Sequence, residues 1–426
     1  MKAAVKSGAD KRDRFGNALD PVVGYARGAI IADEVAESLR QARAYEIIRD
    51  RYARFGDAGV YNLTGLIRAF PFAPGDEDAM RSYVHFIARS QGELETLAIE
   101  RLGGRRDMHD GFLATRITAG MLAIMLALLE SGDRVLSLVE RDRSHPSVKQ
   151  GVGLARGEFE ETVGIDAFVE AVRLDPAPRM VVITTISPSK HHLPLSDLLR
   201  AIELARGRGA LVVLDDAHMA SRLALYDEPP ALALAPGPDV TVWSLDKHMG
   251  GPRSGFVAGR SDLIRRIKAR ALALGVEAQL GQVIAGYRAV EAFDPRPVRE
   301  AAKSAERIHA ALGNATHGLG YLAGAGVAVG GEDFLGIALA RAGREQTTLT
   351  PIEAVAFGSM TILEKMGAVT IPAVGMPGAS CTFRLMTYPD GARMGERAII
   401  DAWNMAIEAT TAALGDPGRV RARLLG

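Results

Sequence analysis

The chain of 426 residues has one cysteine, Cys381, and no excess of charge of either sign. A single cysteine excludes an intramolecular disulfide, and it is typical of proteins kept in a reducing compartment. Lysine plus arginine number 51, and so do aspartate plus glutamate. Because no overall field then attracts nucleic acid or an anionic membrane surface, we expect neither among the partners.

Long apolar runs are also missing. The longest, at 119–129, has 11 residues, whereas a membrane-spanning helix needs about 20. The N-terminal residues 1–20 are charged and lack the apolar centre of a secretory signal. These absences predict a cytoplasmic protein. The length, about three times that of a typical domain, predicts more than one hydrophobic core.

Between about residues 90 and 260, short apolar runs alternate with helical stretches. The runs are RVLSLV (134–139), RMVVITTI (179–186), ALVVLDDA (210–217), VTVWSLD (240–246) and GFVAG (255–259). Runs of this kind are typical of buried parallel strands joined by crossover helices. We therefore predict an α/β fold, a three-layer sandwich around a mostly parallel sheet.

The flanking segments predict two further parts. Apolar residues spaced by three and four predict a helix over 28–56, and a Gly- and Pro-rich stretch follows it. The segment FDPRP at 293–297 has the composition of a hinge. We expect an N-terminal helix and arm over 1–89, a large domain over 90–292, and a smaller C-terminal α+β domain over 293–426.

A lysine and an aspartate each follow a predicted strand. Lys247 precedes a Gly-Gly-Pro turn, and a lysine at the carboxyl edge of a sheet can form a Schiff base with an aldehyde if a neighbouring cation lowers its pKa. Asp215 ends the run LVVLD, where a poorly solvated carboxylate can pair with a cation such as the ring nitrogen of pyridoxal phosphate. His218 follows three residues later. A surface lysine and a helix N-cap remain the alternatives.

Two further segments favour the binding of a phosphate and of a planar ring. Thr118, Ala119 and Gly120 open a helical stretch, where free N–H groups and the helix dipole attract anions. His145, just after the run RVLSLV, has an imidazole that can stack on a ring. An ordinary threonine cap and a surface loop histidine are the alternatives. We predict no metal site, because adjacent His191 and His192 on an extended chain point opposite ways.

Taken in order, the four segments resemble fold type I pyridoxal phosphate enzymes, the aspartate aminotransferase superfamily. The pattern Asp-x-Ala-His at 215–218 resembles the α-oxoamine synthase and serine hydroxymethyltransferase branches. The segment DKHMGGPRSG at 246–255 resembles the Asp-Lys-x-x-Gly-Gly-Pro-x-x-Gly of selenocysteine synthase. The resemblance implies pyridoxal 5'-phosphate as the cofactor.

The resemblance also implies roles for individual residues. Lys247 would hold the cofactor as a Schiff base, Asp215 would face its ring nitrogen, and His145 would cover its ring. The other implied cofactor contacts are Thr118, Ala119, Gly120, His218 and Ser244. Arg384 would bind the substrate α-carboxylate through its planar fork. Arg253 and Ser189 are further candidates for substrate contacts.

For the reaction, the resemblance implies chemistry on a small amino acid through a Cα carbanion. We predict a lyase or a β-replacement transferase that does not use tRNA. An aldolase of the serine hydroxymethyltransferase or threonine aldolase type, an aminotransferase, and a cofactor-binding regulatory homologue without turnover are the alternatives, since fold does not decide among them. A homodimer or a larger homo-oligomer is implied as well.

Overall fold

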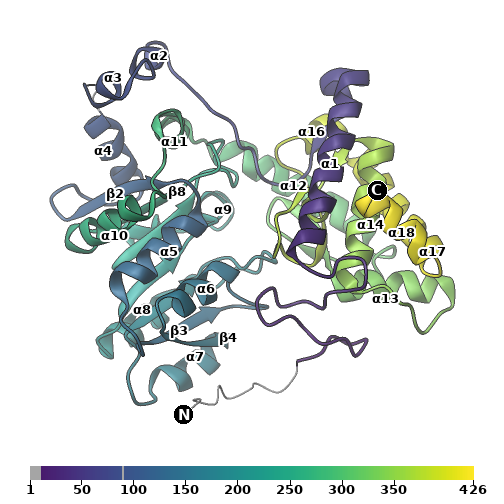
Figure 1. Cartoon of the computed structure of the whole chain (residues 1–426), viewed down its shortest axis with the longest axis horizontal. Coiled ribbons are helices and arrows are strands. Elements are labelled where there is room, and N and C mark those ends of the chain that lie inside the picture. The colour runs from purple at the N-terminus through teal and green to yellow at the C-terminus, as the bar shows by residue number, and fades with distance from the viewer. Residues whose placement is uncertain (1–10, 89–90) are drawn as a thin grey trace. The chain divides into compact units, whose positions relative to one another are not determined.

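The computed structural model describes residues 11–88 and 91–426 and divides into two compact units (Figure 1). One unit is Leu66–Arg299, and the other joins the described residues up to Gly65 with Glu300–Gly426. The first ten residues of the N-terminus, which we expect not to be a secretory signal, lie outside the described part. Among the described residues, every helix is too short or too polar to cross a bilayer.

The unit Leu66–Arg299 contains a seven-stranded sheet in the order β4-β3-β5-β6-β7-β8-β2. Neighbouring strands are parallel except around β8, which runs antiparallel to both β7 and β2. The strands are β2 (His109–Ala114), β3 (Arg134–Val139), β4 (Glu158–Val163), β5 (Met180–Thr184), β6 (Leu211–Asp215), β7 (Val240–Ser244) and β8 (Gly255–Arg260).

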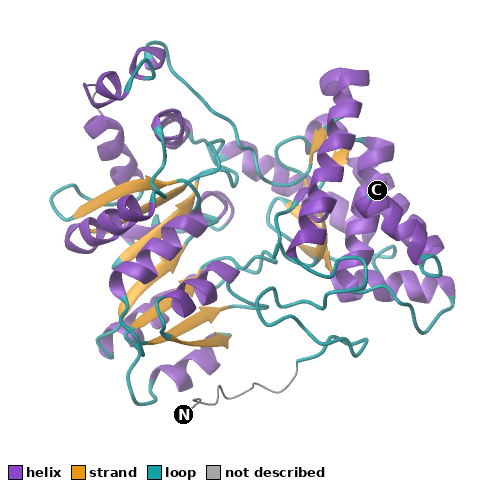
Figure 2. Cartoon of the chain, viewed as in Figure 1, coloured by secondary structure: helices purple, strands orange, loops and turns teal. Residues whose placement is uncertain are grey.

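Helices cover both faces of this sheet (Figure 2). One face packs against α5, α6 and α10, and the other packs against α4, α7, α8, α9 and α11. The helices of the unit are α2 (Asp76–Ala79), α3 (Tyr83–Ala88), α4 (Gln91–Arg101), α5 (Ile117–Leu128), α6 (Pro146–Leu154), α7 (Ile165–Val172), α8 (Leu195–Gly207), α9 (Met219–Leu225), the 3₁₀ turn η2 (Ala231–Ala233), α10 (Ser261–Leu274) and α11 (Leu280–Ala292). The predicted three-layer α/β fold with a mostly parallel sheet is confirmed.

Each of the five apolar runs contains a strand. β3, β5 and β6 are parallel to all of their neighbours, and β7 is parallel to β6. The run at 255–259 forms β8, the antiparallel strand. Only ten residues separate the end of β7 from the start of β8, and a parallel connection needs a dozen or more. Two strands of this sheet, β4 and β2, were not predicted from the sequence. β4 is an edge strand in which acidic and apolar residues mix, and β2 is interrupted by Gly111.

The other unit is mostly helical around two small sheets, β1-β11 and β12-β10-β9. Its elements are α1 (Glu34–Phe55), the 3₁₀ turn η1 (Gly56–Gly59), β1 (Tyr61–Asn62), β9 (Tyr321–Leu322), β10 (Gly326–Gly330), α13 (Gly331–Ala342), α14 (Pro351–Met366), β11 (Ala368–Val369), α15 (Ile371–Val374), β12 (Thr382–Met386), α16 (Gly391–Met394), α17 (Glu396–Ala413) and α18 (Pro417–Leu425). The division between the units falls within α12 (Arg296–Leu312). β10 pairs antiparallel with β12 and with β9.

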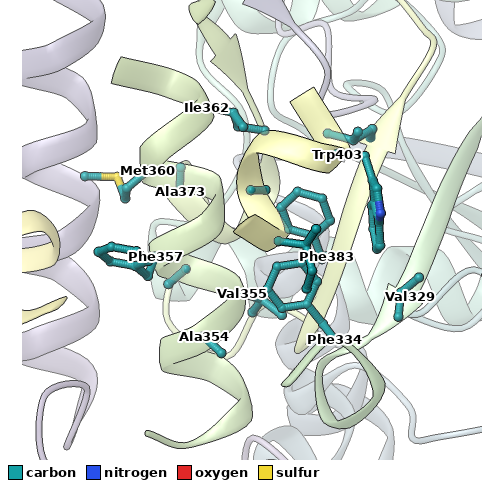
Figure 3. Close-up of a cluster of buried hydrophobic side chains, with 14 of the residues drawn as sticks. Val329, Phe334, Ala354, Val355, Phe357, Met360, Ile362, Ala373, Phe383 and Trp403 are labelled. Atoms are coloured by element: carbon teal, nitrogen blue, oxygen red, sulfur yellow. The ribbon is translucent and has the colours of Figure 1, made fainter. Parts of the chain in front are cut away.

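An aromatic cluster forms the centre of this second core (Figure 3). The rings of Phe334 and Phe383 stack at 4.7 Å between centroids, and both meet Trp403 edge-on. All three side chains are fully buried. Because side chains alternate along a strand, Phe383 and Leu385 of β12 face this core and Arg384 points to the opposite side.

The two units differ from the sequence-based domain limits at 89/90 and 292/293. Ala44 and Ile47 of α1 belong to the same hydrophobic core as α14, so the N-terminal helix packs with the C-terminal residues. Segment 66–88 belongs instead to the sheet unit, where Arg288 of α11 forms an ion pair of 2.9 Å with Asp76 of α2. No local sequence pattern predicts either association, because both join segments more than 200 residues apart in the chain.

Candidate active site

Several predicted site residues lie at the carboxyl edge of the seven-stranded sheet. Asp215 is the last residue of β6, and Ser244 is the last of β7. The helices α5 and α6 begin just after β2 and β3, so their N-termini lie at the same edge. Ligands of open α/β sheets bind at this edge.

Asp215 is a buried carboxylate whose hydrogen bonding is incomplete. Its side chain is 4% exposed, and the backbone N–H of Ala217 donates to it. Its Oδ1 is buried and accepts no hydrogen bond from any residue that the structure describes. Burial raises the pKa of Asp215 to about 6, although the charge of Lys247 acts in the opposite direction. The positive charge of Lys247 therefore acts on the Asp215 carboxylate.

The neighbouring Asp216 has a structural role instead. It is fully buried, and both of its oxygens have partners. Arg222 of α9 donates to it from Nη2 at 2.7 Å and from Nε at 3.1 Å, and Thr185 Oγ1 donates at 2.7 Å. Asp216 therefore anchors α9 to the sheet, and Asp215 is the acid that remains for a ligand.

The turn that carries Lys247 is fixed on both sides. Leu66 forms an isolated antiparallel bridge with Lys247, and the N–H of Ile67 donates to the carbonyl of Asp246 at 2.9 Å. Ser244 Oγ donates to Asp246 Oδ1 at 2.7 Å. These bonds hold the lysine backbone in place directly after β7.

His248 continues this turn in a strained backbone conformation. Its φ is +60°, in the left-handed region that non-glycine residues seldom adopt. Its Nδ1 lies 2.7 Å from Ser221 Oγ of α9, and both side chains are buried. The left-handed residue reverses the chain immediately after Lys247, which lets the Gly-Gly-Pro turn lead into β8.

His145 is the N-cap of α6, a role beyond the predicted contact with a ring. Its Nδ1 accepts a hydrogen bond from the N–H of Ser147 at 3.2 Å. Burial lowers the pKa of His145 to about 3, and the charges of Lys247, Arg143 and Arg116 lower it as well. The imidazole is therefore uncharged near neutral pH, and it lies close to Lys247.

Thr118, Ala119 and Gly120 form the first turn of α5, as a phosphate-binding role requires. Gln282 of α11 fixes the chain around this turn, because its Nε2 donates to the carbonyls of Thr115 at 2.9 Å and Arg253 at 2.8 Å. The Gly255 Cα faces the start of α5 so closely that a Cβ there would lie 2.6 Å from the Cα of Ile117.

We expect Gly255→Ala to displace the first turn of α5 and to weaken cofactor binding by about tenfold or more, since overpacking costs about 1–3 kcal/mol. The clash is with backbone atoms, which cannot move aside as a flexible side chain does. Cofactor titration and thermal unfolding would measure the effect. Gly153→Ala is the matched control, because its Cβ in α6 meets open space, and up to about 1 kcal/mol of stabilisation is expected there. Equal cofactor affinity in the two variants would contradict the prediction.

The remaining predicted contacts are placed as follows. The buried His218 is the N-cap residue of α9, and Lys190 Nζ approaches its ring. Ser189 is buried, and its hydroxyl donates to the carboxylate of Asp142. Arg253 lies in the turn between β7 and β8. The substrate contacts of Ser189 and Arg253 stay predictions.

Arg384 belongs to the other compact unit. It pairs in register with Ala328 of β10 and is 7% exposed. Burial lowers the pKa of its guanidinium to about 10, and Tyr321 raises it in part. The predicted contact with a substrate carboxylate stays a prediction.

Two arginines near Lys247 were missed by sequence reasoning. Arg68 Nε lies 3.2 Å from Asp246 Oδ2. Burial lowers the pKa of the Arg116 guanidinium, the charge of Arg68 lowers it further, and Asp246 raises it. Arg116 precedes Thr118 in the same motif and could have been found there. Arg68 is 178 residues from Asp246, and no local pattern signals their contact.

The fold and the site together define a fold type I pyridoxal phosphate-dependent protein. The buried Oδ1 of Asp215, which has no partner within residues 11–88 and 91–426, suits a protonated ring nitrogen, and the first turn of α5 suits a phosphate. The chain belongs to the UPF0425 family of pyridoxal phosphate-dependent proteins. It is 34% identical over 400 residues to the UPF0425 pyridoxal phosphate-dependent protein of Methanothermobacter thermautotrophicus, covering 93% of this chain and 100% of that protein. Residues 324–393 match the UPF0425 C-terminal domain.

A more distant sequence relative agrees with one predicted branch, and a solved structure shows the same fold. Serine hydroxymethyltransferase 1 of Bordetella parapertussis is 30% identical over 157 residues, which cover 34% of this chain and 35% of that enzyme. The structure of Sphingomonas wittichii serine palmitoyltransferase aligns with a TM-score of 0.54 at 16% identity, covering 87% of this chain and 84% of that one. The predicted superfamily is confirmed, and pyridoxal phosphate, the predicted cofactor, is the one for which the family is named.

Proposed function

We propose that this chain is a pyridoxal phosphate-dependent enzyme that acts on a small amino acid, with lyase or β-replacement chemistry. The observation that carries the proposal is Asp215, a buried carboxylate at the carboxyl edge of the sheet whose Oδ1 has no partner among the described residues. Lys247 lies near enough to change its pKa. A buried carboxylate oxygen without a hydrogen-bond partner is costly inside a protein, and a cationic ring nitrogen would offset that cost.

Different residues at this edge of the sheet would bind different parts of the cofactor. The N–H groups of Thr118 and Ala119 would hold the phosphate, whereas that of Gly120 donates to the carbonyl of Arg116 at 3.1 Å. Asp215 would keep the ring nitrogen protonated. Lys247 would provide the amine for covalent attachment. When bound, pyridoxal phosphate supplies an electron sink for negative charge that develops at the substrate Cα.

Lys247 is also our candidate for proton transfer. Once its Nζ is released by the amino group of the substrate, it would accept the proton from Cα as general base. His145, with a pKa of about 3, is too weak a base for this task near neutral pH. Its uncharged ring instead suits a packing contact with the planar ring of the cofactor. Loss of a β-substituent would complete a lyase reaction, and addition of a nucleophile would complete a replacement.

A second candidate is aldol-type cleavage of a β-hydroxy amino acid. The local similarity to serine hydroxymethyltransferase 1 favours it. This reaction needs a base that removes the proton of the β-hydroxyl group. It gives an aldehyde as product, whereas β-elimination gives a keto acid and ammonia, so the two reactions are easily separated.

The proposal is tested on the purified full-length protein with added pyridoxal phosphate. We expect a visible absorption band that borohydride bleaches, and peptide mapping should place the reduced cofactor on Lys247. β-Substituted and β-hydroxy amino acids are then screened for release of keto acid or aldehyde. A colourless protein that binds no pyridoxal phosphate would overturn the proposal, and cofactor on another lysine would overturn the role of Lys247.

Three of the sequence-based predictions remain proposals. The first is a homodimer or larger homo-oligomer, which sedimentation equilibrium would test. The second is a cytoplasmic location. The third is the regulatory alternative, in which the protein binds the cofactor without turnover. That alternative would gain support if the cofactor attached to Lys247 and the screen gave no product.

A further inference from the structure

The side chain of Gln282, in the first turn of α11, bridges two segments of the candidate site. Its Nε2 donates to the carbonyl of Thr115 at 2.9 Å and to the carbonyl of Arg253 at 2.8 Å. Both lengths are typical of good N–H···O hydrogen bonds. Thr115 lies two residues before α5, and Arg253 lies two residues before β8. One amide group therefore joins the start of α5 to the turn between β7 and β8.

The chemistry of the partners fixes the orientation of this amide. A glutamine amide has an oxygen that accepts and an NH₂ group with two donors, and the two ends are assigned from their partners. Both partners of Gln282 are backbone carbonyls, which only accept. The NH₂ group therefore faces Thr115 and Arg253, and it has one N–H for each carbonyl. A side chain of the same shape without donors could not make this bridge.

On one side, the bridge reaches a closed turn that contains Lys247. The N–H of Gly251 donates to the carbonyl of Leu245 at 2.8 Å, and the N–H of Leu245 donates to the carbonyl of Ser254 at 3.1 Å. These bonds tie the chain after Lys247 back to the residues just before it. The carbonyl of Arg253, which adjoins Ser254, therefore moves together with the Lys247 turn.

On the other side, the bridge reaches a segment that is held by the same part of the chain as Gln282. The N–H of Thr115 donates to the carbonyl of Val276 at 2.9 Å, and the N–H of Ala278 donates to the carbonyl of Leu113 at 2.8 Å. The loop before α11 therefore holds Thr115 at its N–H, and Gln282 holds the same residue at its carbonyl. The start of α5 is thus fixed to α11.

We propose that Gln282 is a positioning residue that sets the separation between the first turn of α5 and the turn that carries Lys247. A ligand that contacts both turns gains from a fixed separation, because its second contact is intramolecular once the first is made. The two contacts would be made by the phosphate and the aldehyde of pyridoxal phosphate, and this use of the two turns rests on the proposed function. The bridge itself does not.

Two ligands distinguish this coupling from a general loss of structure. Pyridoxal phosphate reaches both turns, whereas deoxypyridoxine phosphate has a methyl group in place of the aldehyde and cannot attach to Lys247. Gln282→Met keeps the length of the side chain and removes its donors. We expect this variant to bind pyridoxal phosphate about tenfold more weakly, and deoxypyridoxine phosphate at most about threefold more weakly. Equal losses for the two ligands would overturn the proposal.

Matched variants test the donors of Gln282. Gln282→Lys should recover most of the loss, because an ammonium group has donors for both carbonyls. Gln282→Glu should bind pyridoxal phosphate at least as weakly as Gln282→Met near neutral pH, because a carboxylate only accepts. Gln279→Met is the control: Gln279 is exposed, its Nε2 lies 3.5 Å from the carbonyl of Glu277 in its own loop, and both ligands should bind normally. Normal affinity in Gln282→Glu would contradict the assigned donors.

Hydrogen exchange of the cofactor-free protein tests the bridge without any ligand. In Gln282→Met, the amides of segments 115–121 and 247–255 should exchange several-fold faster than in the unaltered protein, while those of α8 should not change. Unchanged exchange in both segments would overturn the proposal. If Gln282→Met does not fold, Gln282→Asn, whose side chain is one methylene shorter, replaces it with the same expected directions. If the unaltered protein bound neither ligand, the proposed function would fail, whereas hydrogen exchange would still decide the role of Gln282.

Discussion

Replacing Lys247 with alanine is expected to abolish covalent attachment of pyridoxal phosphate and to lower turnover by about 10²–10⁴-fold. The first effect follows because the ε-amine is the only nucleophile of this side chain, and the second because general acid–base catalysis contributes about 10²–10⁴-fold. Borohydride trapping and steady-state kinetics on the substrate found by screening would measure the two effects.

The charge of Lys247 must be separated from its nucleophilicity. Lys247→Arg keeps a cation near Asp215 and His145, whose pKa values both respond to Lys247, but it lacks the nucleophilic amine. We therefore expect Lys247→Arg to lose attachment as completely as Lys247→Ala. Lys268→Ala, on the exposed side of α10, should keep both attachment and turnover. Turnover in Lys247→Ala within about tenfold of normal would remove Lys247 from the chemistry, since a general base contributes more than that.

The central strands could be predicted from the sequence, because their residues are buried on both faces and so form continuous apolar runs. Val181, Val212 and Val242 are all fully buried, and each lies within such a run. Their polar ends could be predicted for the same reason: Asp215 and Lys247 interrupt or follow runs that are otherwise apolar. The edge strand β4 and the antiparallel direction of β8 depend on neighbours and connection lengths, which apolarity alone does not encode.

Which residues belong to the site could be predicted less well, because this depends on contacts between segments that are distant in the chain. Asp215 and Asp216 are adjacent acids at the end of one strand. Arg222 and Thr185 donate hydrogen bonds to Asp216, which therefore has the structural role. Arg68 approaches Asp246 only because segment 66–68 runs beside the Lys247 turn. Lys190 contacts His218 from a left-handed backbone conformation, which residues other than glycine seldom adopt.

Replacing Asp215 with asparagine is expected to lower turnover by about 10²–10³-fold, the usual cost of removing one preorganised charged group. The same change should stabilise the cofactor-free protein near neutral pH. The buried carboxylate has an Oδ1 with no partner among the described residues, and asparagine places no charge there. Thermal and denaturant unfolding of the cofactor-free protein would measure the second effect.

The sign of the pH dependence follows from the raised pKa. In the unfolded chain the pKa of Asp215 is 3.8, and in the folded protein it is about 6. Between these values the folded state holds a proton that the unfolded state has lost, so stability falls as the pH rises. From about pH 5 to 7.5 this group alone removes about 1.4 kcal/mol from the free energy of unfolding. The lowered pKa of His145 acts in the opposite direction, so Asp215→Asn is compared with the unaltered protein at each pH.

The adjacent acid provides the decisive control, because the structure predicts the opposite sign for it. Asp216→Asn removes the charge that Arg222 pairs with at 2.7 Å, and both side chains are fully buried. Breaking a buried ion pair costs about 3–5 kcal/mol, and here Glu228 retains part of the charge balance. We therefore expect Asp216→Asn to lower stability at every pH and Asp215→Asn to raise it toward neutral pH. If Asp215→Asn also lowered the stability of the cofactor-free protein, Asp215 would have a structural partner, and its assignment to the cofactor would be wrong.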